Sequence, residues 1–500
     1  MTDRKRYSFY KGVFSDNALD FSKRSSFIKE VMLERIYPSR VILPMKQNYG
    51  VPAIPTVSVG EYVKIGQCVG LPPKGSFGIP VHTGISGTVT DISEITLPNG
   101  ITTMAVHIKN DMKRNRVSSI VSRNEIDVSY RDLIGIIRDA GICGMGGEGI
   151  PTAAKIIRAR NQSVSDLLVN CLQSEPYATS DFMMLDEYPS YVVLGASAVA
   201  RACGVKKISF LISAERKLER TALNSAIELA KKDFPEMEYS IKLFRNRFPQ
   251  GYFRLIARAL YKVELKENET LEEKCHAVLF NCSTLSACWE AISDNIPMMS
   301  RIITITSDMG VGHNVLAPIG TPVAEILSNV NNTVETGSRV VWGNALTGVI
   351  VEDPENTPII KLTPAITVIR KQEVPRTPCI HCGLCVESCP MGLSPNIVFE
   401  MLVQGLNHKA SEEGARDCIA CGACSYICPA GINLTGKIAA FASEGKIVGE
   451  NSLLHSETVN GDKIDLGEIT LLENYNVEKK EEENVEDDSI SLPFSKEKKV

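Results

Sequence analysis

The stretch Cys379-Ile-His-Cys382-Gly-Leu-Cys385-Val-Glu-Ser-Cys389-Pro390 is matched in spacing by Cys418-Ile-Ala-Cys421-Gly-Ala-Cys424-Ser-Tyr-Ile-Cys428-Pro429. Both read C-x2-C-x2-C-x3-C-P, the spacing that holds [4Fe–4S] clusters. Two intervening residues let the backbone curl so that three thiolates face one cubane. Glycine after the second cysteine lets backbone amides approach the sulfides, and proline after the fourth turns the chain away. The spacing predicts a domain with two iron–sulfur clusters.

The fourth cysteine of each run is expected to bind the cluster of the other run, as in two-cluster ferredoxins. The two predicted ligand sets are Cys379, Cys382, Cys385 and Cys428, and Cys418, Cys421, Cys424 and Cys389. A pair of zinc sites is the alternative, but zinc explains neither the third cysteine of each run nor the prolines. His381 lies inside the first run and is expected to be a neighbour of the cluster, not a ligand.

Helical spacing of apolar residues surrounds the cysteines. It predicts one helix from Pro395 to Lys409 and a second from Leu434 to Ala442. We therefore expect residues 371–445 to form a small helical domain with two [4Fe–4S] clusters. Because each run contributes to both clusters, the clusters should lie close together and relay electrons.

The composition of the whole chain limits the partners. With 54 Lys+Arg against 59 Asp+Glu, the net charge is −5, which argues against nucleic acid as a partner. No apolar run approaches the roughly 20 residues that cross a bilayer, and no secretory signal follows the charged N-terminus. The expected location is cytoplasmic, where 15 cysteines favour metal or redox chemistry over disulfides.

The chain of 500 residues has room for about three domains, possibly four, at roughly 150 residues each. Residues 1–36 are expected to be an N-terminal extension. Residues 37–115 contain short strands broken by glycine and proline, and they resemble a barrel-sandwich hybrid of the biotinyl or lipoyl type. A carrier domain of that type presents a modifiable lysine in a fixed signature, which is absent around Lys74, so a structural role is favoured.

Residues 125–298 alternate helix and strand, as α/β folds do. Helices are expected over Tyr130–Ala140, Val192–Ala202, Arg216–Lys231 and Phe253–Lys262, and strands over Leu167–Asn170, Lys207–Ile212 and Ala277–Phe280. Residues 299–370 are β-rich and show no catalytic constellation. Residues 446–500 are acidic and are expected to be a disordered tail.

A glycine loop, Gly141-Ile-Cys-Gly-Met-Gly-Gly-Glu-Gly149, opens a helix that carries proline at its start. Backbone N–H groups at such a helix N-terminus can hold a phosphate, and Lys155 adds positive charge. The loop matches neither the Rossmann nor the P-loop motif. A purely structural turn is the alternative.

Cys143, Cys171 and Cys282 fall in the three segments expected to lie near this loop. They can be small buried hydrophobic residues. Alternatively, Cys143 is a redox thiol whose pKa is lowered by the adjacent helix N-terminus.

The order of these regions resembles the RnfC family of ferredoxin–NAD oxidoreductase components and, in the α/β part, the flavin-carrying subunit of respiratory complex I. Matching stretches include "VILPMKQNYGVPAIPTVSVGEYVKIGQCVG", "GICGMGGEGIPTAAKI", "LLVNCLQSEPYATSD", "NCSTLSA", "RIITITSDMGVGHN", "IGTPVAEIL" and both cysteine runs, across about residues 35–445. The resemblance implies a multidomain α/β plus β fold with a barrel-sandwich hybrid, a complex-I-like FMN domain, an SLBB β-grasp domain at 299–370 and a helical 2[4Fe–4S] domain. It implies that FMN is held by Gly144, Gly146, Gly147, Gly149, Lys155, Asn170, Ser174, Glu175, Asn281 and Thr284.

Two departures bear on a nicotinamide site. Such families carry Gly-Ala-Gly-Phe-Pro-Thr in the loop, where the phenylalanine can stack on adenine. Here the loop reads Gly147-Glu148-Gly149-Ile150-Pro151-Thr152. Ile150 removes the aromatic face, and Glu148 adds negative charge near bound phosphates. Both changes weaken the case for NAD, which stays open as a cofactor.

The resemblance is greatest to soluble electron-transfer proteins associated with proline reductase. It implies an oxidoreductase component that passes electrons from NADH or a reduced protein, through FMN and two [4Fe–4S] clusters, to a partner reductase. The alternatives are a membrane-docked subunit of an Rnf-type ferredoxin–NAD oxidoreductase and a pure iron–sulfur relay. A binding module with structural clusters is a further alternative, and the relay arrangement disfavours it.

Overall fold

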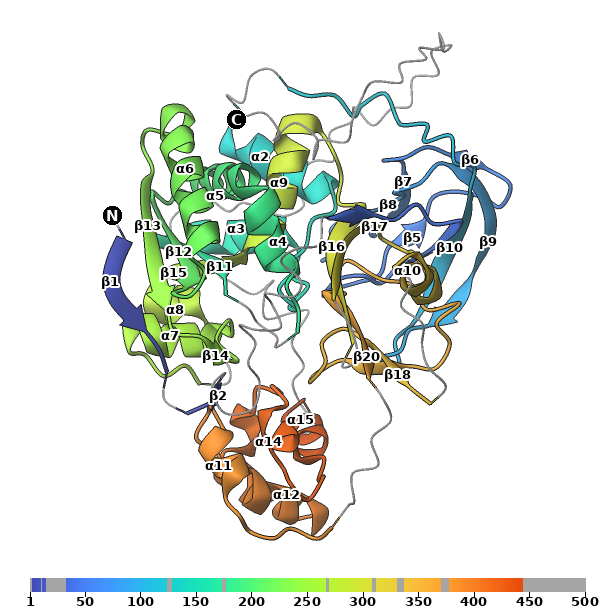
Figure 1. Cartoon of the computed structure of the whole chain (residues 1–500). Helices are drawn as coiled ribbons and strands as arrows, with labels where there is room; N and C mark the ends of the chain where they lie inside the picture. The colour runs from blue at the N-terminus through green and yellow to red at the C-terminus, as the bar shows by residue number, and fades with distance from the viewer. Residues whose placement is uncertain are drawn as a thin grey trace.

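The computed structural model describes residues 2–9, 11–14, 33–123, 128–172, 177–266, 269–307, 312–330, 337–369 and 377–443. Figure 1 shows an α/β domain on one side, a β-rich half beside it, and a small helical domain below both. The expected acidic tail lies outside the described residues.

The α/β domain is built on a five-stranded sheet in which all neighbouring strands run parallel. Its order is β1 (Thr2–Tyr7), β13 (Glu238–Phe244), β12 (Lys207–Ser213), β11 (Asp166–Cys171) and β15 (Ala277–Asn281). The central strands are almost continuously apolar because helices cover both faces.

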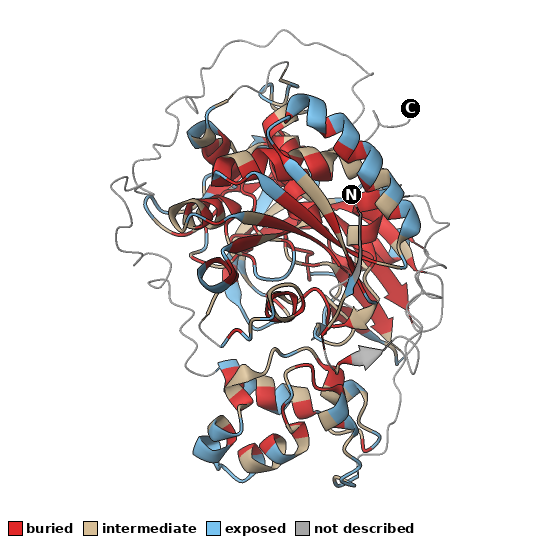
Figure 2. Ribbon diagram, turned by 90° about the vertical axis from the view of Figure 1, so that its left-hand side faces the viewer, coloured by how far each residue is buried: buried red, intermediate tan, exposed pale blue. Residues whose placement is uncertain are grey.

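One face of this sheet packs on five long helices and the shorter α4. These are α2 (Tyr130–Asp139), α3 (Thr152–Asn161), α4 (Ser180–Glu187), α5 (Pro189–Cys203), α6 (Lys217–Asp233) and α9 (Cys282–Asp294). The opposite face packs on α7 (Phe253–Tyr261) and α8 (Leu271–Cys275). Figure 2 shows the buried residues concentrated in this sheet and its covering helices.

The helices expected over Tyr130–Ala140, Val192–Ala202, Arg216–Lys231 and Phe253–Lys262 are present as α2, α5, α6 and α7. The three expected strands are β11, β12 and β15.

The N-terminal segment is part of the fold, although the sequence suggested an extension. β1 forms the edge of the parallel sheet beside β13, and β3 (Glu34–Arg35) pairs with β17 (His313–Pro318) in the β-rich half. The charged sequence Thr-Asp-Arg-Lys-Arg-Tyr of β1 gives no strand signal, because edge strands tolerate charge that central strands do not.

The first part of the β-rich half contains two small sheets, which form the barrel-sandwich domain. One consists of β4 (Arg40–Pro44), β10 (Thr102–Asn110), β9 (Gly87–Thr96) and β6 (Tyr62–Val63). The other consists of β5 (Ile54–Pro55), β7 (Cys68–Leu71) and β8 (Val81–His82).

The second part is a mixed sheet crossed by α10 (Val323–Asn329), here called the β-grasp domain. Its order is β19 (Val349–Val351), β18 (Arg339–Trp342), β20 (Ala365–Ile369), β16 (Ser300–Ser307), β17 and β3. The first and last strands of the segment, β16 and β20, lie parallel in the middle, and hairpins flank them, which is the β-grasp topology.

Residues 377–443 form the cluster domain, which is helical as expected. Its elements are α11 (Leu384–Ser388), α12 (Pro395–Val403), α13 (Asn407–Glu412), the 3-10 helix η1 (Ala415–Asp417), α14 (Ala423–Tyr426) and α15 (Leu434–Ser443). The single helix expected over Pro395–Lys409 is two helices, because Gly405 adopts a φ of +74° and ends the first.

A buried lysine joins the barrel-sandwich, α/β and β-grasp domains. Lys361, 1% exposed, donates from Nζ to the carbonyls of Pro80 (3.0 Å) and Gly141 (2.7 Å). Burial lowers the pKa of Lys361 to about 8. The glycine loop that follows Gly141 is therefore fixed by contacts from two other domains.

Across the described segments, no helix combines the length and apolar character needed to span a membrane.

Candidate functional site

The glycine loop is a closed hairpin whose tip is exposed. Gly144 N–H donates to the carbonyl of Ile150 (2.9 Å), and Gly149 N–H donates to the carbonyl of Gly144 (3.2 Å). At the tip, Gly147 has a φ of +107°, and a Cβ placed there would have no neighbour within 4 Å. Gly144 and Gly149 thus close the neck, while the amides of Gly146 and Gly147 have no acceptor among the described residues.

The N-terminus of α9 holds this loop from below. Thr284, fully buried, accepts the N–H of Met145 (2.9 Å). Asn281 caps α9 by accepting the N–H groups of Ser283 and Thr284, and its amide donates to Asp181 (2.8 Å). Asn281 and Thr284, expected to hold FMN, therefore at least position the loop.

Asn170 lies at the end of β11, where its side chain is 8% exposed. Its amide donates to the carbonyl of Gly251 (2.9 Å), and its side-chain oxygen accepts the N–H of Leu172. Ser174 and Glu175 lie outside the described residues, so their expected contact with FMN stays a prediction.

Lys155 lies on the first turns of α3, as expected, but its charge has a partner within the loop. Its Nζ is 3.2 Å from the Glu148 carboxylate and 5.5 Å from the centroid of the Phe280 ring. The ammonium group holds the pKa of Glu148 below its ordinary value. A phosphate here would share Lys155 with Glu148, which weakens its attraction relative to a free lysine.

A cavity lies beside the loop tip, and residues from five segments line it. They are Met145, Gly146, Gly147, Ala178, Ser180, Asp181, Phe182, Arg301, Asn344, Leu362 and Pro364. The last four belong to the β-grasp domain, in which the sequence showed no site. The cavity thus lies between domains, and no sequence signal marked Asp181, Arg301 or Asn344.

Cys143 is fully buried, and burial raises the pKa of its thiol to about 11. A redox thiol needs a lowered pKa and access, so the burial and the raised pKa of Cys143 favour the packing role. Desolvation outweighs the nearby positive charges of Lys361 and Arg301, which lower the pKa. Cys171 and Cys282 are also fully buried. All three fit the role of small packing residues.

The cluster domain contains two small cavities, and each gathers four cysteines. The first is lined by Cys379, Cys382, Cys385 and Cys428. The second is lined by Cys389, Cys418, Cys421 and Cys424. These are the quartets that cross-ligation predicts, since each run supplies three cysteines to one cavity and its fourth to the other.

The two cysteine runs adopt matching backbone conformations. The residue before the second cysteine, His381 or Ala420, has a φ of +53°, and the following glycines, Gly383 and Gly422, have φ of +78° and +80°. The backbone N–H of His381 donates to the sulfur of Cys379, and the backbone N–H of Ala420 donates to the sulfur of Cys418, both at 3.4 Å. Backbone N–H groups therefore point toward the cavities, as they do around cluster sulfurs. The donor set and the backbone both fit cubane clusters.

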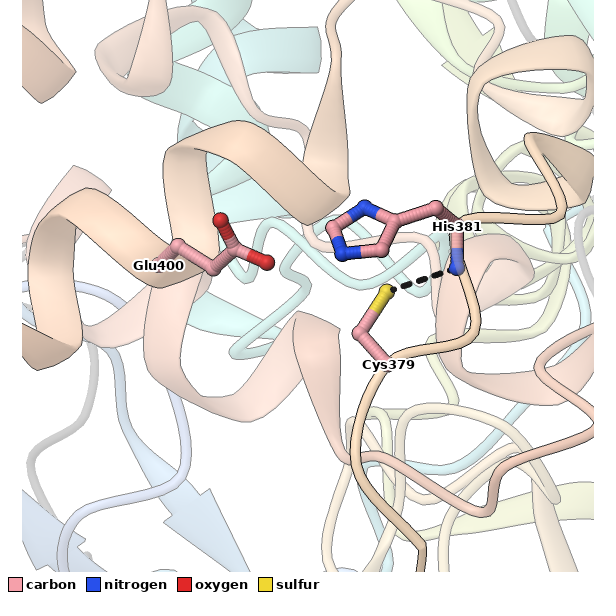
Figure 3. Close-up of side chains that lie close together, drawn as sticks. All are labelled: Cys379, His381 and Glu400. Carbon is pink, nitrogen blue, oxygen red and sulfur yellow. Dashed lines mark hydrogen bonds between the residues drawn. The ribbon is translucent and has the colours of Figure 1, made fainter.

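His381 lies beside the first cavity. Figure 3 shows its ring between the carboxylate of Glu400 and the sulfur of Cys379, and the three ligand atoms lie within 4.8 Å of one another. Such a trio could hold a metal ion, but Cys379 also belongs to a complete cysteine quartet. We therefore interpret His381 as a neighbour of the cluster, in line with the sequence.

The second cavity lies against the other domains. Cys421 and Ala423 share one apolar cluster with Tyr177 and Phe248 of the α/β domain and Leu346 of the β-grasp domain. Tyr252 is within electrostatic reach of Glu148 on one side and of Cys418 and Cys421 on the other; burial, followed by these charges, raises its pKa to about 12.

The first cavity has an exposed rim. Ile380 is 62% exposed, and Cys382 is also exposed. We call the cavity that contains Cys421 the proximal site and the cavity that contains Cys382 the distal site.

Comparison with protein families identifies three parts of the chain. Residues 7–113 match the RnfC barrel-sandwich hybrid domain, residues 137–290 match the Nuo51 FMN-binding domain, and residues 377–432 match a 4Fe–4S dicluster domain.

Curated relatives match across these parts together. The C subunit of the proton-translocating ferredoxin:NAD(+) oxidoreductase complex of Clostridium ljungdahlii is 29% identical, over 81% of this chain and 87% of its own length. The corresponding protein of the Na(+)-translocating complex of Acetobacterium woodii is 29% identical, over 76% and 85%. The C subunit of the ion-translocating oxidoreductase complex of Yersinia enterocolitica is 30% identical over 72% of this chain, which spans about half of that relative, 51%.

This chain is an RnfC-like protein.

The RnfC-like chain accordingly combines a barrel-sandwich hybrid domain, an FMN-binding α/β domain and a 4Fe–4S dicluster domain in one electron-transfer subunit. The fold and cofactors expected from the sequence are confirmed at this level. A solved NAD+-reducing [NiFe]-hydrogenase is similar over 68% of the RnfC-like chain and 64% of its own, at 16% identity and a TM-score of 0.47.

Proposed function

We propose that this protein accepts electrons at FMN beside the glycine loop and delivers them singly, through the proximal and then the distal [4Fe–4S] cluster, to a partner protein. FMN supplies exchange of two electrons with the donor and their release one at a time, whereas an iron–sulfur cluster carries one.

The observation that carries this proposal is the unequal placement of the two cysteine cavities. The proximal site is packed against the domains that line the glycine-loop cavity, because Cys421 and Ala423 share an apolar cluster with Phe248 and Leu346. The distal site has an exposed rim that a partner can approach. This order runs from a shielded interior to the surface.

The residues around FMN have distinct proposed roles. Gly146 and Gly147 offer exposed backbone amides, and Lys155 offers a cation that Glu148 partly neutralises. Asn281 and Thr284 fix the loop to α9. We propose that Asn170, through its bond to Gly251, shapes the floor of the site.

The proposal has two forms, in which the electron donor is either NADH or a reduced protein. If the donor is NADH, the nicotinamide must bind next to Glu148 and Ile150, without an aromatic stacking partner at position 150. If the donor is a reduced protein, these residues need no nucleotide. The exposed Glu148 at the loop tip favours the protein donor, because its charge opposes nucleotide phosphates.

The acceptor has two candidates. One is a soluble reductase such as proline reductase, which the resemblance in sequence suggests. The other is a membrane-bound complex of the Rnf type, in which the relatives named above are subunits. We favour neither, since both fit a protein that docks at the distal rim.

Anaerobic spectroscopy and rapid mixing test the proposal. The purified protein should contain FMN and roughly eight iron atoms per chain. Reduction of the flavin by a donor should precede reduction of the clusters. If the protein contains both clusters but no flavin, only the alternative of a pure iron–sulfur relay remains. Zinc in place of iron would refute the proposal. NADH and a reduced ferredoxin are then added in separate experiments, and the one that bleaches the flavin absorbance is identified as the donor.

A further inference from the structure

The β-grasp wall of the glycine-loop cavity presents two polar side chains, Arg301 and Asn344. Arg301 is buried without an ion-pair partner among the described residues, and the side-chain oxygen of Asn344 accepts no hydrogen bond there. Arg301 lies near the start of β16, and Asn344 lies in the turn between β18 and β19.

Arg301 is 5% exposed. Its Nη1 donates to the carbonyl of Lys361 and its Nε to the carbonyl of Ile302 at 3.5 Å. A guanidinium has five N–H groups, and within the described segments no carboxylate forms an ion pair with this one. Arg254, 8% exposed, shows the usual solution: it pairs with Asp417 at 2.7 Å and also bonds two carbonyls.

The charge of Arg301 persists despite burial. Burial lowers its pKa to about 10, and the largest opposing influence is the carboxylate of Asp181. Asp181 itself accepts from Asn281 and Ser283. A buried, partly compensated cation is costly unless a further acceptor reaches it, and the cavity is where such an acceptor would lie.

Asn344 supplies the complementary group. Its side-chain oxygen is buried and has no hydrogen-bond partner among the described residues. Its backbone carbonyl accepts the N–H groups of Thr347 (3.3 Å) and Gly348 (2.7 Å), which hold the turn in place. The wall therefore combines a cationic donor with a fixed acceptor.

The opposite wall includes the glycines of the loop tip. Gly146 and Gly147 have no side chains, and nothing lies within 4 Å of a Cβ at Gly147. A planar ring fits against such a backbone surface.

We propose that Arg301 and Asn344 bind the pyrimidine edge of the flavin ring, so that the β-grasp domain completes the FMN site. This edge presents carbonyl, N–H and carbonyl groups in turn, which matches an arginine donor beside an amide acceptor. After uptake of two electrons and one proton, the reduced ring carries negative charge at N1, and Arg301 stabilises it. The inference rests on the proposed function only in that FMN binds this cavity.

The test compares Arg301→Met, Arg301→Lys and Asn344→Asp with the parent protein and with Arg339→Met, an exposed arginine on the same sheet. Each iron-loaded protein is stripped of flavin, titrated with FMN by fluorescence, and examined for the flavin midpoint potential. Cluster spectra verify that the iron sites are intact.

We expect Arg301→Met to weaken FMN binding about tenfold or more and to lower the flavin potential, since it removes a charged hydrogen bond. A tenfold larger loss of affinity for reduced than for oxidised FMN corresponds to about 30 mV for a two-electron couple. Arg301→Lys should restore part of the potential, and Asn344→Asp should lower it while FMN stays bound. Arg339→Met should change neither.

Unchanged affinity and potential in both Arg301→Met and Asn344→Asp would overturn the inference and leave the proposed function standing. A parent protein that fails to bind FMN would overturn both. If Arg301→Met does not fold, Asn344→Asp decides, because it keeps the size of the side chain and the backbone hydrogen bonds of the turn.

Discussion

The two cysteine runs have the same spacing, the same glycine conformations and the same sulfur contacts, yet they lie in different surroundings. The run that begins at Cys418 packs against two other domains, whereas the run that begins at Cys379 has exposed residues, Ile380 and Cys382. Local sequence therefore determines how a cluster is held, and tertiary contacts determine whether it faces the interior or a partner.

Loss of one ligand from each site should separate the two roles most strongly. Cys421→Ser and Cys382→Ser should each lower the iron content by roughly half. Cys421→Ser should slow electron transfer from flavin to the remaining cluster by about a hundredfold or more, while Cys382→Ser should leave reduction of the proximal cluster intact and stop delivery to the partner. Stopped-flow absorbance and iron analysis measure both, and equal kinetic effects in the two variants would contradict the proposed order.

The matched glycines provide a second comparison. A Cβ at Gly422 would lie 2.7 Å from the carbonyl oxygen of Leu346, whereas a Cβ at Gly383 would meet nothing within 4 Å. Both positions have positive φ, so Gly383→Ala should cost about 1 kcal/mol. Gly422→Ala should cost about 1 kcal/mol more, because the β-grasp turn has to shift. Anaerobic thermal unfolding midpoints measure the difference. Similar midpoints for the two variants would mean that the close approach of Gly422 to Leu346 contributes little to stability.

The ion pair between Arg254 and Asp417 tests how firmly the proximal side is held. These residues join the α/β domain to the cluster domain at 2.7 Å, and the Asp417 side chain is 43% exposed. Asp417→Asn should reduce stability by about 0.5–1 kcal/mol and slow flavin-to-cluster transfer a few-fold. Glu236→Gln, which breaks an equally short pair with Arg201 inside the α/β domain, is the control. An equal slowing in the control would remove the link between docking and transfer.

The smallest effect is expected at Cys143, which contrasts with the cysteines of both runs. Because burial raises the pKa of this thiol to about 11, it stays protonated at neutral pH and should resist iodoacetamide in the folded protein. Cys143→Ala should leave turnover with a protein acceptor within about twofold. A severalfold loss of turnover with normal flavin and iron content would restore the redox alternative.

The parts of this molecule that were predictable from sequence are those that local spacing determines. Cys379 to Pro390 and its counterpart indicated the cluster domain, and the segment Lys207–Ile212 indicated the strand β12. The exposed glycines of the loop tip were also identified. The domain boundaries themselves stay predictions.

The parts that were missed depend on contacts between distant segments. β1 was missed because an edge strand can be charged, and Arg301 was missed because an isolated arginine in a β-rich stretch has no local signal. The burial of Cys143 was not visible from its neighbours in the sequence, because the core around it combines residues from three domains.

Lys361, which donates to the carbonyls of Pro80 and Gly141, affects how the domains unfold on heating. Since it ties the two β domains to the α/β domain inside shared packing, these three should melt as one cooperative unit in a calorimeter. The cluster domain has its own apolar core, so its heat absorption should form a separate peak that moves when iron is removed.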